Sequence, residues 1–302
     1  MSRKGPDLKR LVAGLGGECL WSEPLSRHTT LKIGGPADLL YLPAEIDDLQ
    51  QLMTRAHAAR VPVFVLGGSN LLVQDGGIRG IVVTLRRMTR VRALDEVRIE
   101  ADAGVPLTRL ARYAAERSLT GFEFALGIPG TVGGGVVMNA GTPRGDVGGC
   151  VESVRIVTPA GRLRDASRPE IEFGYRWSRL PGGIITAATL RLERGDRETI
   201  RRRMQEDSHR RRETQPLTLP NAGSVFKNPE GSPAARLIEA AGLKGLRIGD
   251  AQISDRHANF IVNCGQASAR DVVALIRTIG RTVEQRNGVR LELELRIVGA
   301  VH

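Results

Sequence analysis

Cysteine is scarce in this chain of 302 residues, which has only Cys19, Cys150 and Cys264. Their odd number and wide separation argue against a disulfide framework and against a Cys-x-x-Cys metal site, and they favour a reducing compartment. No apolar run approaches the ~20 residues of a membrane span, and the N-terminal residues contain no long apolar stretch typical of an export signal. We therefore expect a cytoplasmic protein without a metal site and without membrane attachment.

Aromatic residues are also few, at 4% of the chain, whereas 44 basic residues exceed 33 acidic ones and give a net charge of +11. Such an excess suits nucleic acids, anionic surfaces or small anionic ligands. The densest basic stretch, residues 194–214, is interrupted throughout by acidic residues and has no aromatic ring on which a base could stack. We interpret it as a solvated helix with a thin apolar stripe at Ile200 and Met204, and we expect no nucleic acid partner.

The hydrophobic pattern predicts a chain of mixed helices and strands, long enough for two or three domains. The expected elements before the basic helix are helices at 45–60 and 106–118, strands at 61–66, 80–85, 97–101 and 183–193, and a hairpin at 151–166. After it, Ser232 and Pro233 predict the start of a helix. A strand is expected at 257–263, followed by a long helix that begins with a capping box of Ser268 and Asp271.

The C-terminal segment VRLELELRI, residues 289–297, alternates strictly between apolar and charged side chains. This period of two predicts a strand with one face in the core. The opposite face then carries Arg290, Glu292, Glu294 and Arg296. Alternation alone does not distinguish the two glutamates.

Two glycine-rich segments lie beside apolar strands: LGGSN at 66–70 and GIPGTVGGGVVMNAG at 127–141. Neither fits the GxGxxG dinucleotide fingerprint, and no Lys-Ser/Thr follows Gly133–Gly135 as it would in a P-loop. Glycine permits positive φ angles and close approach to the backbone, and clusters of backbone N–H groups in such loops cradle phosphates. Each segment alone could equally form tight turns, but the pair favours a bound phosphate ester.

LGGSNLLV, GIPGTVGGGVVMNAG and FGYRWS (173–178) resemble the FAD-binding domain of the vanillyl-alcohol-oxidase type, although relatives have one more residue in the first segment (LGxGSN). The resemblance implies that both segments bind FAD. Because neither contains cysteine or histidine, we expect the FAD to be noncovalent. The implied contacts are Gly67, Gly68, Ser69, Asn70, Leu71, Pro129, Gly130, Thr131, Gly133, Gly134 and Asn139.

Two further segments, NAGSVFKNP (221–229) and LELELR (291–296), are more specific. Together with the glycine segments they resemble the UDP-N-acetylenolpyruvoylglucosamine reductase family, over about residues 29–299. The short spacing between Arg176 and Ser224 is similar to the second type of that family, which lacks an inserted loop over the substrate. The resemblance implies that a UDP-sugar enolpyruvyl ether is reduced to UDP-N-acetylmuramate, for peptidoglycan synthesis, with NADPH as co-substrate and FAD as carrier.

The same resemblance implies three catalytic residues. Arg176 offers a planar, permanently charged fork to the substrate carboxylate. Ser224 donates a proton to the carbanion, and Glu294 helps to hold the charge on the carboxylate. The implied substrate contacts are Tyr175, Arg211, Arg212, Lys227, Asn228 and Lys244.

Each catalytic candidate also has an ordinary structural interpretation. Arg176 could pair with Glu172 on the surface, Ser224 could be a turn serine, and Glu294 could lie on a solvated strand face. Glu292 competes with Glu294 for the same role, and only the E-x-R spacing of the family favours Glu294.

The expected fold is α+β. It comprises a two-part FAD-binding domain of the vanillyl-alcohol-oxidase type, at 1–86 and 87–200, and a smaller C-terminal α+β substrate domain at 201–302. We expect a monomeric reductase. The alternatives are an FAD-dependent alcohol or sugar oxidase of the same superfold and a nucleotide-binding module without catalysis, since fold alone does not fix function. GSVFKNP favours the reductase, because an oxidase has no reason to carry it.

Overall fold

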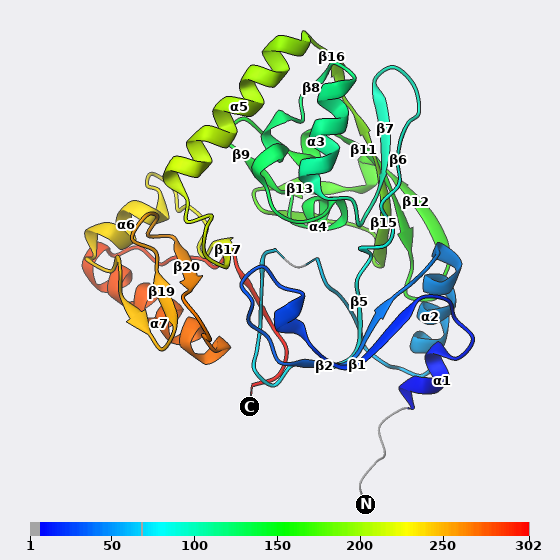
Figure 1. Cartoon of the computed structure of the whole chain (residues 1–302), viewed down its shortest axis with the longest axis horizontal. Coiled ribbons are helices and arrows are strands. Elements are labelled where there is room, and N and C mark those ends of the chain that lie inside the picture. The colour runs from blue at the N-terminus through cyan, green and yellow to red at the C-terminus, as the bar shows by residue number, and fades with distance from the viewer. Residues whose placement is uncertain (1–6, 68, 302) are drawn as a thin grey trace, which may run out of the picture. The chain divides into compact units, whose positions relative to one another are not determined.

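The structure is a computed structural model of the chain, and it describes residues 7–67 and 69–301. The described residues form two compact units whose segments alternate along the sequence (Figure 1). The first unit takes residues 7–21, 38–67 and 80–209, and the second takes 22–37, 69–79 and 210–301. The expected α+β class is confirmed. The division into three domains at residues 86 and 200 stays a prediction.

Two sheets form the framework of the first unit. The four-stranded sheet, most of which lies in this unit, has the order β1 (Glu18–Pro24), β2 (Pro36–Leu42), β5 (Ile78–Val83), β3 (Val63–Val65). The antiparallel five-stranded sheet has the order β12 (Leu163–Ser167), β11 (Val151–Val157), β15 (Ile184–Arg191), β7 (Arg98–Asp102), β6 (Val91–Ala93). All the strands expected before residue 194 are confirmed, with small differences in their bounds.

Shorter elements complete the first unit. The paired short strands are β8 (Leu119–Thr120) with β16 (Glu193–Arg194), β9 (Gly141–Thr142) with β10 (Gly145–Asp146), and β13 (Glu172–Gly174) with β14 (Trp177–Arg179). The helices are α1 (Leu8–Val12), α2 (Ile46–Ala58), α3 (Leu107–Glu116) and α4 (Val132–Val137), with 3₁₀ turns η2 (Glu123–Gly127), η3 (Val147–Gly149) and η4 (Arg168–Glu170). Helices α2 and α3 confirm the two expected amphipathic helices, because their apolar positions are buried.

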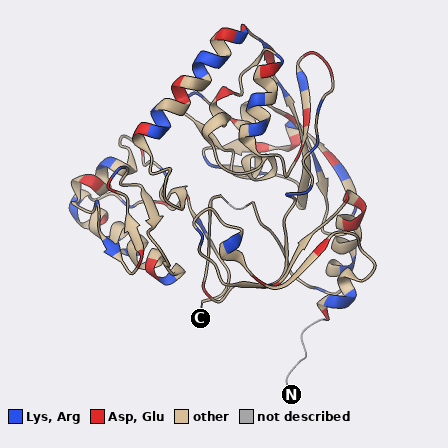
Figure 2. Ribbon diagram, viewed as in Figure 1, with Lys and Arg blue, Asp and Glu red and all other residues tan. Residues whose placement is uncertain are grey.

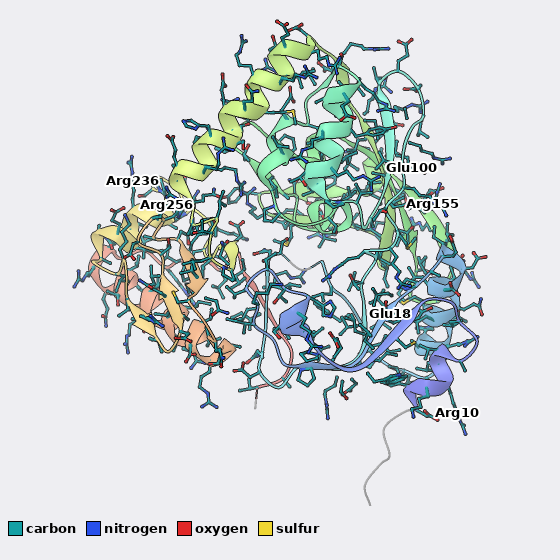
Figure 3. All side chains as sticks on the ribbon, viewed as in Figure 1. Arg10, Glu18, Glu100, Arg155, Arg236 and Arg256 are labelled. Atoms are coloured by element: carbon teal, nitrogen blue, oxygen red, sulfur yellow. The ribbon has the colours of Figure 1, made fainter. Side chains whose placement is uncertain are left out.

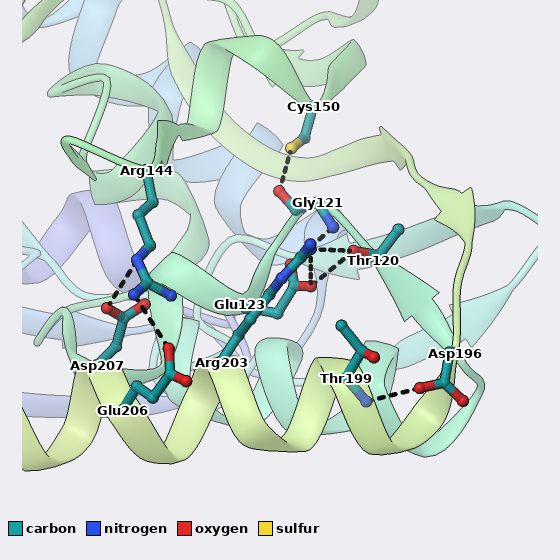
Figure 4. A network of polar contacts seen from close by, with 10 residues as sticks. All are labelled: Thr120, Gly121, Glu123, Arg144, Cys150, Asp196, Thr199, Arg203, Glu206 and Asp207. Carbon is teal, nitrogen blue, oxygen red and sulfur yellow. Dashed lines mark hydrogen bonds and ion pairs between the residues drawn. The ribbon is translucent and has the colours of Figure 1, made fainter.

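Helix α5 (Arg197–Thr214) carries basic and acidic residues interspersed along its length (Figure 2). Ile200 and Met204 are buried, as the expected apolar stripe requires. The structure adds a third buried position, Asp207, whose Oδ1 lies 3.4 Å from Nε of Arg144 (Figure 4). A buried carboxylate that the hydrophobic pattern did not predict therefore helps to attach this helix to the first unit.

The five-stranded sheet carries ion pairs between its strands. Arg155 lies 3.8 Å from Glu100 and 3.0 Å from Asp165, and the first two are labelled in Figure 3. Because these pairs are partly exposed, each contributes little to stability. The apolar core, which includes the fully buried Tyr41 and Phe122, contributes far more.

The second unit contains a four-stranded sheet of order β17 (Asn221–Ser224), β20 (Phe260–Asn263), β19 (Ala251–Ile253), β18 (Arg247–Ile248), and a parallel pair of β4 (Leu71–Val73) and β21 (Arg296–Val298). Its helices are α6 (Ala234–Ala240) and α7 (Ala269–Asn287), with the 3₁₀ turn η1 (Leu25–Arg27). The predicted capping box of α7 is confirmed, since Ser268 Oγ accepts from Asp271 N at 3.1 Å and the aspartate side chain accepts in return. No helix within residues 7–67 and 69–301 is long and apolar enough to cross a membrane.

The start of α6 differs from the expectation. Pro233 occupies the N-cap and the helix begins at Ala234, so the predicted N-cap at Ser232 is wrong. Because proline has no polar side chain, the cap comes from elsewhere, and Asn228 Oδ1 accepts from Ala234 N at 3.0 Å. Gly242, with φ +70°, follows the last turn.

Candidate functional site

The uncharged segment 127–141 runs beside residues 103–107 of its own unit. Gly133 N donates to Ala103 O at 2.9 Å, and a Cβ built on Gly133 would lie 2.9 Å from the Cβ of Ala103. What approaches Gly133 is therefore the protein's own backbone. The N–H group of Gly133 is already bound within the protein, and the expected contact of this residue with the cofactor stays a prediction.

Gly67 and Gly134 have more open surroundings, because the nearest atom to a Cβ built on either would lie 3.8 Å away. Gly130 has φ +111°, a conformation that only glycine adopts readily. A Cβ built on Gly67 would lie 3.8 Å from the Cα of Gly134, so the two segments meet within the first unit. Gly68 lies outside the described residues. Side-chain-free backbone from two segments fits a dinucleotide whose pyrophosphate is held by N–H groups rather than by cations.

Asn139 lies near the end of the glycine-rich segment, and its expected contact with the cofactor stays a prediction. It is 4% exposed and has φ +42°. Its Nδ2 donates to Gly174 O at 2.9 Å, and its Oδ1 accepts from Gly148 N at 2.8 Å. Both polar groups of the side chain therefore act inside the protein, where they join the segment to the FGYRWS turn.

The FGYRWS sequence forms the hairpin of β13 and β14, with Gly174 paired to Trp177. Tyr175 and Arg176 occupy its tip, and the guanidinium carbon of Arg176 lies 4.9 Å from the centre of the Tyr175 ring. Arg176 has φ +65°, in the left-handed region that non-glycine residues enter at a cost. Strain of this kind at a non-glycine residue is a pointer to function.

The ion pair at the base of this hairpin tests the alternative in which Arg176 pairs with Glu172. Glu172 pairs with Arg179, whose Nη1 lies 2.7 Å from Glu172 Oε2. Ser178 Oγ donates to Val137 O at 3.0 Å and so ties the hairpin to the end of α4. The surface pair that was the alternative for Arg176 is thus formed by Arg179 instead.

In the second unit, residues 224–227 of GSVFKNP, here called the serine strand, continue from the end of β17 as extended chain. They are hydrogen-bonded to residues 292–295, with an isolated bridge between Phe226 and Leu293. Lys227 N donates to Glu292 O at 2.8 Å. Glu294 N and Leu295 N both donate to Val225 O, at 2.9 and 3.1 Å. Two successive donors on one carbonyl mark a bulge, which interrupts the side-chain alternation.

The predicted strict alternation over 289–297 is therefore wrong. Leu293 is 36% exposed, Glu294 is half-buried, and the regular strand β21 begins only at Arg296. The bulge separates the two glutamates that alternation had placed in equivalent positions. Glu292 has a side chain that is 73% exposed, and its Oε1 lies 2.5 Å from Lys227 Nζ.

The second half of LGGSN lies in the second unit and joins the same assembly. Asn70 Nδ2 donates to Glu294 O at 2.9 Å, and Asn70 O accepts from Arg296 N at 3.2 Å. Leu71 begins the buried strand β4. Thr30, which the sequence analysis did not single out, donates its hydroxyl to Ser69 O at 3.1 Å.

Asn259 is a second residue that sequence reasoning missed. It is 3% exposed, its O accepts from Val225 N, and both polar groups of its side chain bind the backbone of Phe226. The available signal was an amide inside the apolar stretch HANFIVN, because a buried amide requires partners.

The remaining substrate candidates are spread over the second unit. Asn228 caps α6, as described above. Arg211 and Arg212 lie in the last turn of α5, where basic residues also stabilise the helix through its dipole. Lys244 Nζ lies 2.8 Å from Glu239 Oε1, and burial lowers the pKa of the nearby His257. Substrate binding by these residues stays a prediction.

Comparison with known proteins covers most of the chain. Two family models match: an FAD binding domain over residues 37–167, and the C-terminal domain of UDP-N-acetylenolpyruvoylglucosamine reductase over residues 215–298. UDP-N-acetylenolpyruvoylglucosamine reductase 2 of Symbiobacterium thermophilum is 48% identical over 281 residues, which are 92% of this chain and 91% of that protein. The reductase of Heliobacterium modesticaldum is 48% identical over 296 residues, or 97% and 94%. The crystal structure of the Thermus caldophilus reductase has a TM-score of 0.80 and 40% identity, covering 94% of this chain and all of that one.

Proposed function

The chain belongs to the UDP-N-acetylenolpyruvoylglucosamine reductase family, and from that premise we propose that it reduces UDP-N-acetylglucosamine enolpyruvate to UDP-N-acetylmuramate in peptidoglycan precursor synthesis. It is an FAD-containing oxidoreductase that uses NADPH. When bound, the flavin supplies the electron transfer from NADPH to the vinyl group of the substrate. The observation that carries the proposal is that Asn70, the serine strand and residues 292–295 are hydrogen-bonded together.

The serine strand supplies the proton in this proposal. Addition of hydride to the vinyl carbon leaves negative charge on the carbon next to the substrate carboxylate, and Ser224 donates a proton to that carbon. A hydroxyl is a weak acid, so this step requires neighbouring groups that stabilise the charge. Lys227 lies three residues further along the strand. Glu294, which is half-buried and fixed through its backbone to Val225, hydrogen-bonds the carboxylate in this proposal.

Arg176 holds the substrate carboxylate. Its guanidinium is always charged and presents two parallel donors, which match the two oxygens of a carboxylate. The left-handed backbone at this position fixes the direction in which the side chain leaves the turn. A residue retained there despite its conformational cost is expected to have a role that glycine cannot fill.

The residues that would hold the flavin are Gly67, Ser69, Asn70 and Leu71 of the first glycine segment, and Gly130, Thr131 and Gly134 of the second. We expect noncovalent binding, because neither glycine segment contains a cysteine or histidine. We also propose that the protein is cytoplasmic, works as a monomer on a UDP-sugar, and binds no nucleic acid.

The test is NADPH oxidation by the purified yellow protein under anaerobic conditions, with and without the UDP-enolpyruvyl substrate. We expect rapid steady oxidation only when the substrate is present. Acid precipitation should release free flavin into the supernatant. Oxidation of an alcohol or sugar with oxygen as acceptor, and no response to the enolpyruvyl substrate, would favour the oxidase alternative.

A further inference from the structure

The carboxamide of Asn259 continues a sheet beyond the end of its backbone ladder. Strands β17 and β20 pair as far as Ser224 and Phe260, and the next backbone bond runs from Val225 N to Asn259 O at 2.9 Å. Beyond that point the side chain of Asn259, rather than its backbone, supplies the hydrogen bonds. Its Oδ1 accepts from Phe226 N at 3.0 Å, and its Nδ2 donates to Phe226 O at 2.8 Å.

The opposite edge of the serine strand explains why the side chain is needed. Phe226 faces Leu293 in an antiparallel bridge, flanked by the bonds from Lys227 N to Glu292 O and from Glu294 N to Val225 O. In this type of pair the N–H and C=O groups of the facing residues point away from each other. The polar groups of the Phe226 backbone are therefore directed at Asn259.

Burial raises the free-energy cost of losing this contact. Phe226 is 2% exposed and Asn259 is 3% exposed, so water does not replace a lost partner. A buried N–H or C=O group without a partner is costly, and the backbone would shift to recover one. Because Ser224 lies two residues before Phe226, such a shift would move its hydroxyl.

We propose that Asn259 is a positioning residue for proton transfer, which acts by fixing the peptide groups of Phe226 and thereby the hydroxyl of Ser224. The inference rests on the proposed function, in which Ser224 donates the proton. Only a carboxamide of this length offers one donor and one acceptor side by side, as an opposing strand would.

Asn263, at the far end of strand β20 from Asn259, provides a matched control. It is also 3% exposed, and its side chain donates to Leu31 O and accepts from Gly265 N and Ala267 N. Its hydrogen bonds do not include the serine strand. Asn263→Ala and Asn259→Ala should therefore both lower the thermal midpoint, since each removes buried hydrogen bonds.

The two variants should differ in chemistry and in local exchange. Stopped-flow absorbance on the holoenzyme separates reduction by NADPH from reoxidation by substrate. In Asn259→Ala we expect reoxidation to slow by about 10²-fold, the effect of a misplaced catalytic group, with reduction by NADPH almost unchanged. Amide hydrogen exchange should accelerate in the peptide that contains Phe226. Asn263→Ala should show neither effect.

A double-mutant cycle tests whether Asn259 acts through Ser224. In the Ser224→Ala background, adding Asn259→Ala should slow reoxidation by less than about twofold, because the positioned group is already gone. If Ser224→Ala slows reoxidation but Asn259→Ala does not, or if the two effects multiply fully, the inference is wrong and the proposed function stands. If Ser224→Ala leaves reoxidation unchanged, the proposed proton donor itself is wrong.

A second variant covers the case in which Asn259→Ala does not fold. Asn259→Asp preserves the shape and the acceptor for Phe226 N, but an ionised carboxylate cannot donate to Phe226 O. We expect the same selective loss of reoxidation with faster exchange at Phe226. Wild-type reoxidation in a folded Asn259→Asp protein would overturn the inference.

Discussion

The turn that carries Arg176 and the strand that carries Ser224 each depend on one buried asparagine, yet the two asparagines hold different kinds of backbone. Asn139 binds the residue before a tight turn, through a single bond to Gly174 O. Asn259 binds Phe226 within the serine strand, through a donor and an acceptor. The first arrangement fixes where a turn begins, whereas the second fixes a peptide segment along its length.

The turn and the strand also differ in how exposed their residues are. At the turn, Tyr175 is 50% exposed and Arg176 adopts a left-handed backbone. On the strand, Val225 and Phe226 are 3% and 2% exposed and are bonded on both edges. We infer that proton transfer depends on a rigid, buried segment, whereas carboxylate binding uses a more accessible side chain in a strained turn. Substitutions at Ser224, Arg176, the two glutamates and His257 test this contrast.

Ser224→Ala should have the largest effect. Loss of a general acid typically costs ~10²–10⁴-fold, and the alternative donor here is an unpositioned water molecule. We expect that loss in reoxidation of the reduced flavin by substrate, measured by stopped-flow absorbance. Flavin content and reduction by NADPH should stay as in the wild type.

Ser224→Cys serves as the control for this variant, because a thiol in the same place can still donate a proton. It should recover part of the reoxidation rate. Loss of NADPH reduction with normal reoxidation in Ser224→Ala would remove this residue from the proton-transfer step and would break the contrast at its buried side.

Substitutions of Arg176 should lower activity without lowering stability. Arg176→Lys keeps the charge but loses the planar fork, and we expect turnover to fall by about 10- to 100-fold, the value of a lost charge-assisted hydrogen bond. Arg176→Gly should lose at least as much activity but gain roughly 1 kcal/mol of stability, since glycine accepts the left-handed backbone without strain. Kinetics with urea denaturation of both variants measures the two effects.

The opposite result is informative. A less stable Arg176→Gly protein would show that contacts of the arginine side chain outweigh the backbone strain. Activity of Arg176→Lys within about twofold of the wild type would show that bidentate binding is not required. The turn would then be a structural element, and only the serine strand would remain as a catalytic one.

Sequence patterns predicted the regular elements well because burial alone determines them. Helices α2 and α3 follow the spacing of Leu49, Leu52 and Leu107, and α7 begins at its capping box. Local patterns failed where distant backbone supplies the partner. The Ser232 cap was expected from neighbouring residues, but the group that caps α6 comes from Asn228.

The candidate site shows the same limit. The glycine segments and GSVFKNP were identified by resemblance, but the use of each glycine was not, because the close contact of Gly133 with Ala103 depends on chain packing. The bulge at Glu294 depends on a carbonyl of Val225, almost seventy positions away in sequence and invisible to strand alternation. Asn139 and Asn259 were overlooked as structural residues for the same reason.

Glu294→Gln and Glu292→Gln should differ by a smaller amount, roughly tenfold in reoxidation, if one hydrogen bond to a charged group is lost only in the first. The bulge is the physical reason, since it leaves Glu292 exposed beside Lys227 and Glu294 half-buried. Single-turnover reoxidation at saturating substrate measures the difference. Equal or reversed effects would transfer the role to Glu292.

Substitution of His257 should have the smallest effect, and it should change only the stability of the buried strand. Its ring packs edge-on against Phe260, with centroids 4.6 Å apart, and burial lowers its pKa in the folded state. The unfolded chain, with an ordinary histidine pKa of about 6.5, therefore takes up the proton first as the pH falls. The stabilisation by neutral His257 is fully present above about pH 6.5 and is lost as the pH falls through the lower, folded-state value.

The urea midpoint of the wild type should consequently fall more between pH 7.5 and pH 5.5 than that of His257→Gln, which has no ring to protonate. Other titrating groups contribute equally to both proteins, so the difference isolates this histidine. Because His257 lies two residues before Asn259, amide exchange at low pH should rise in residues 257–263 before it rises in the hairpin 172–179. Equal pH dependence in the two proteins, or earlier exchange in the hairpin, would show that the buried strand is not the acid-sensitive element, and the contrast between strand and turn would not extend to pH.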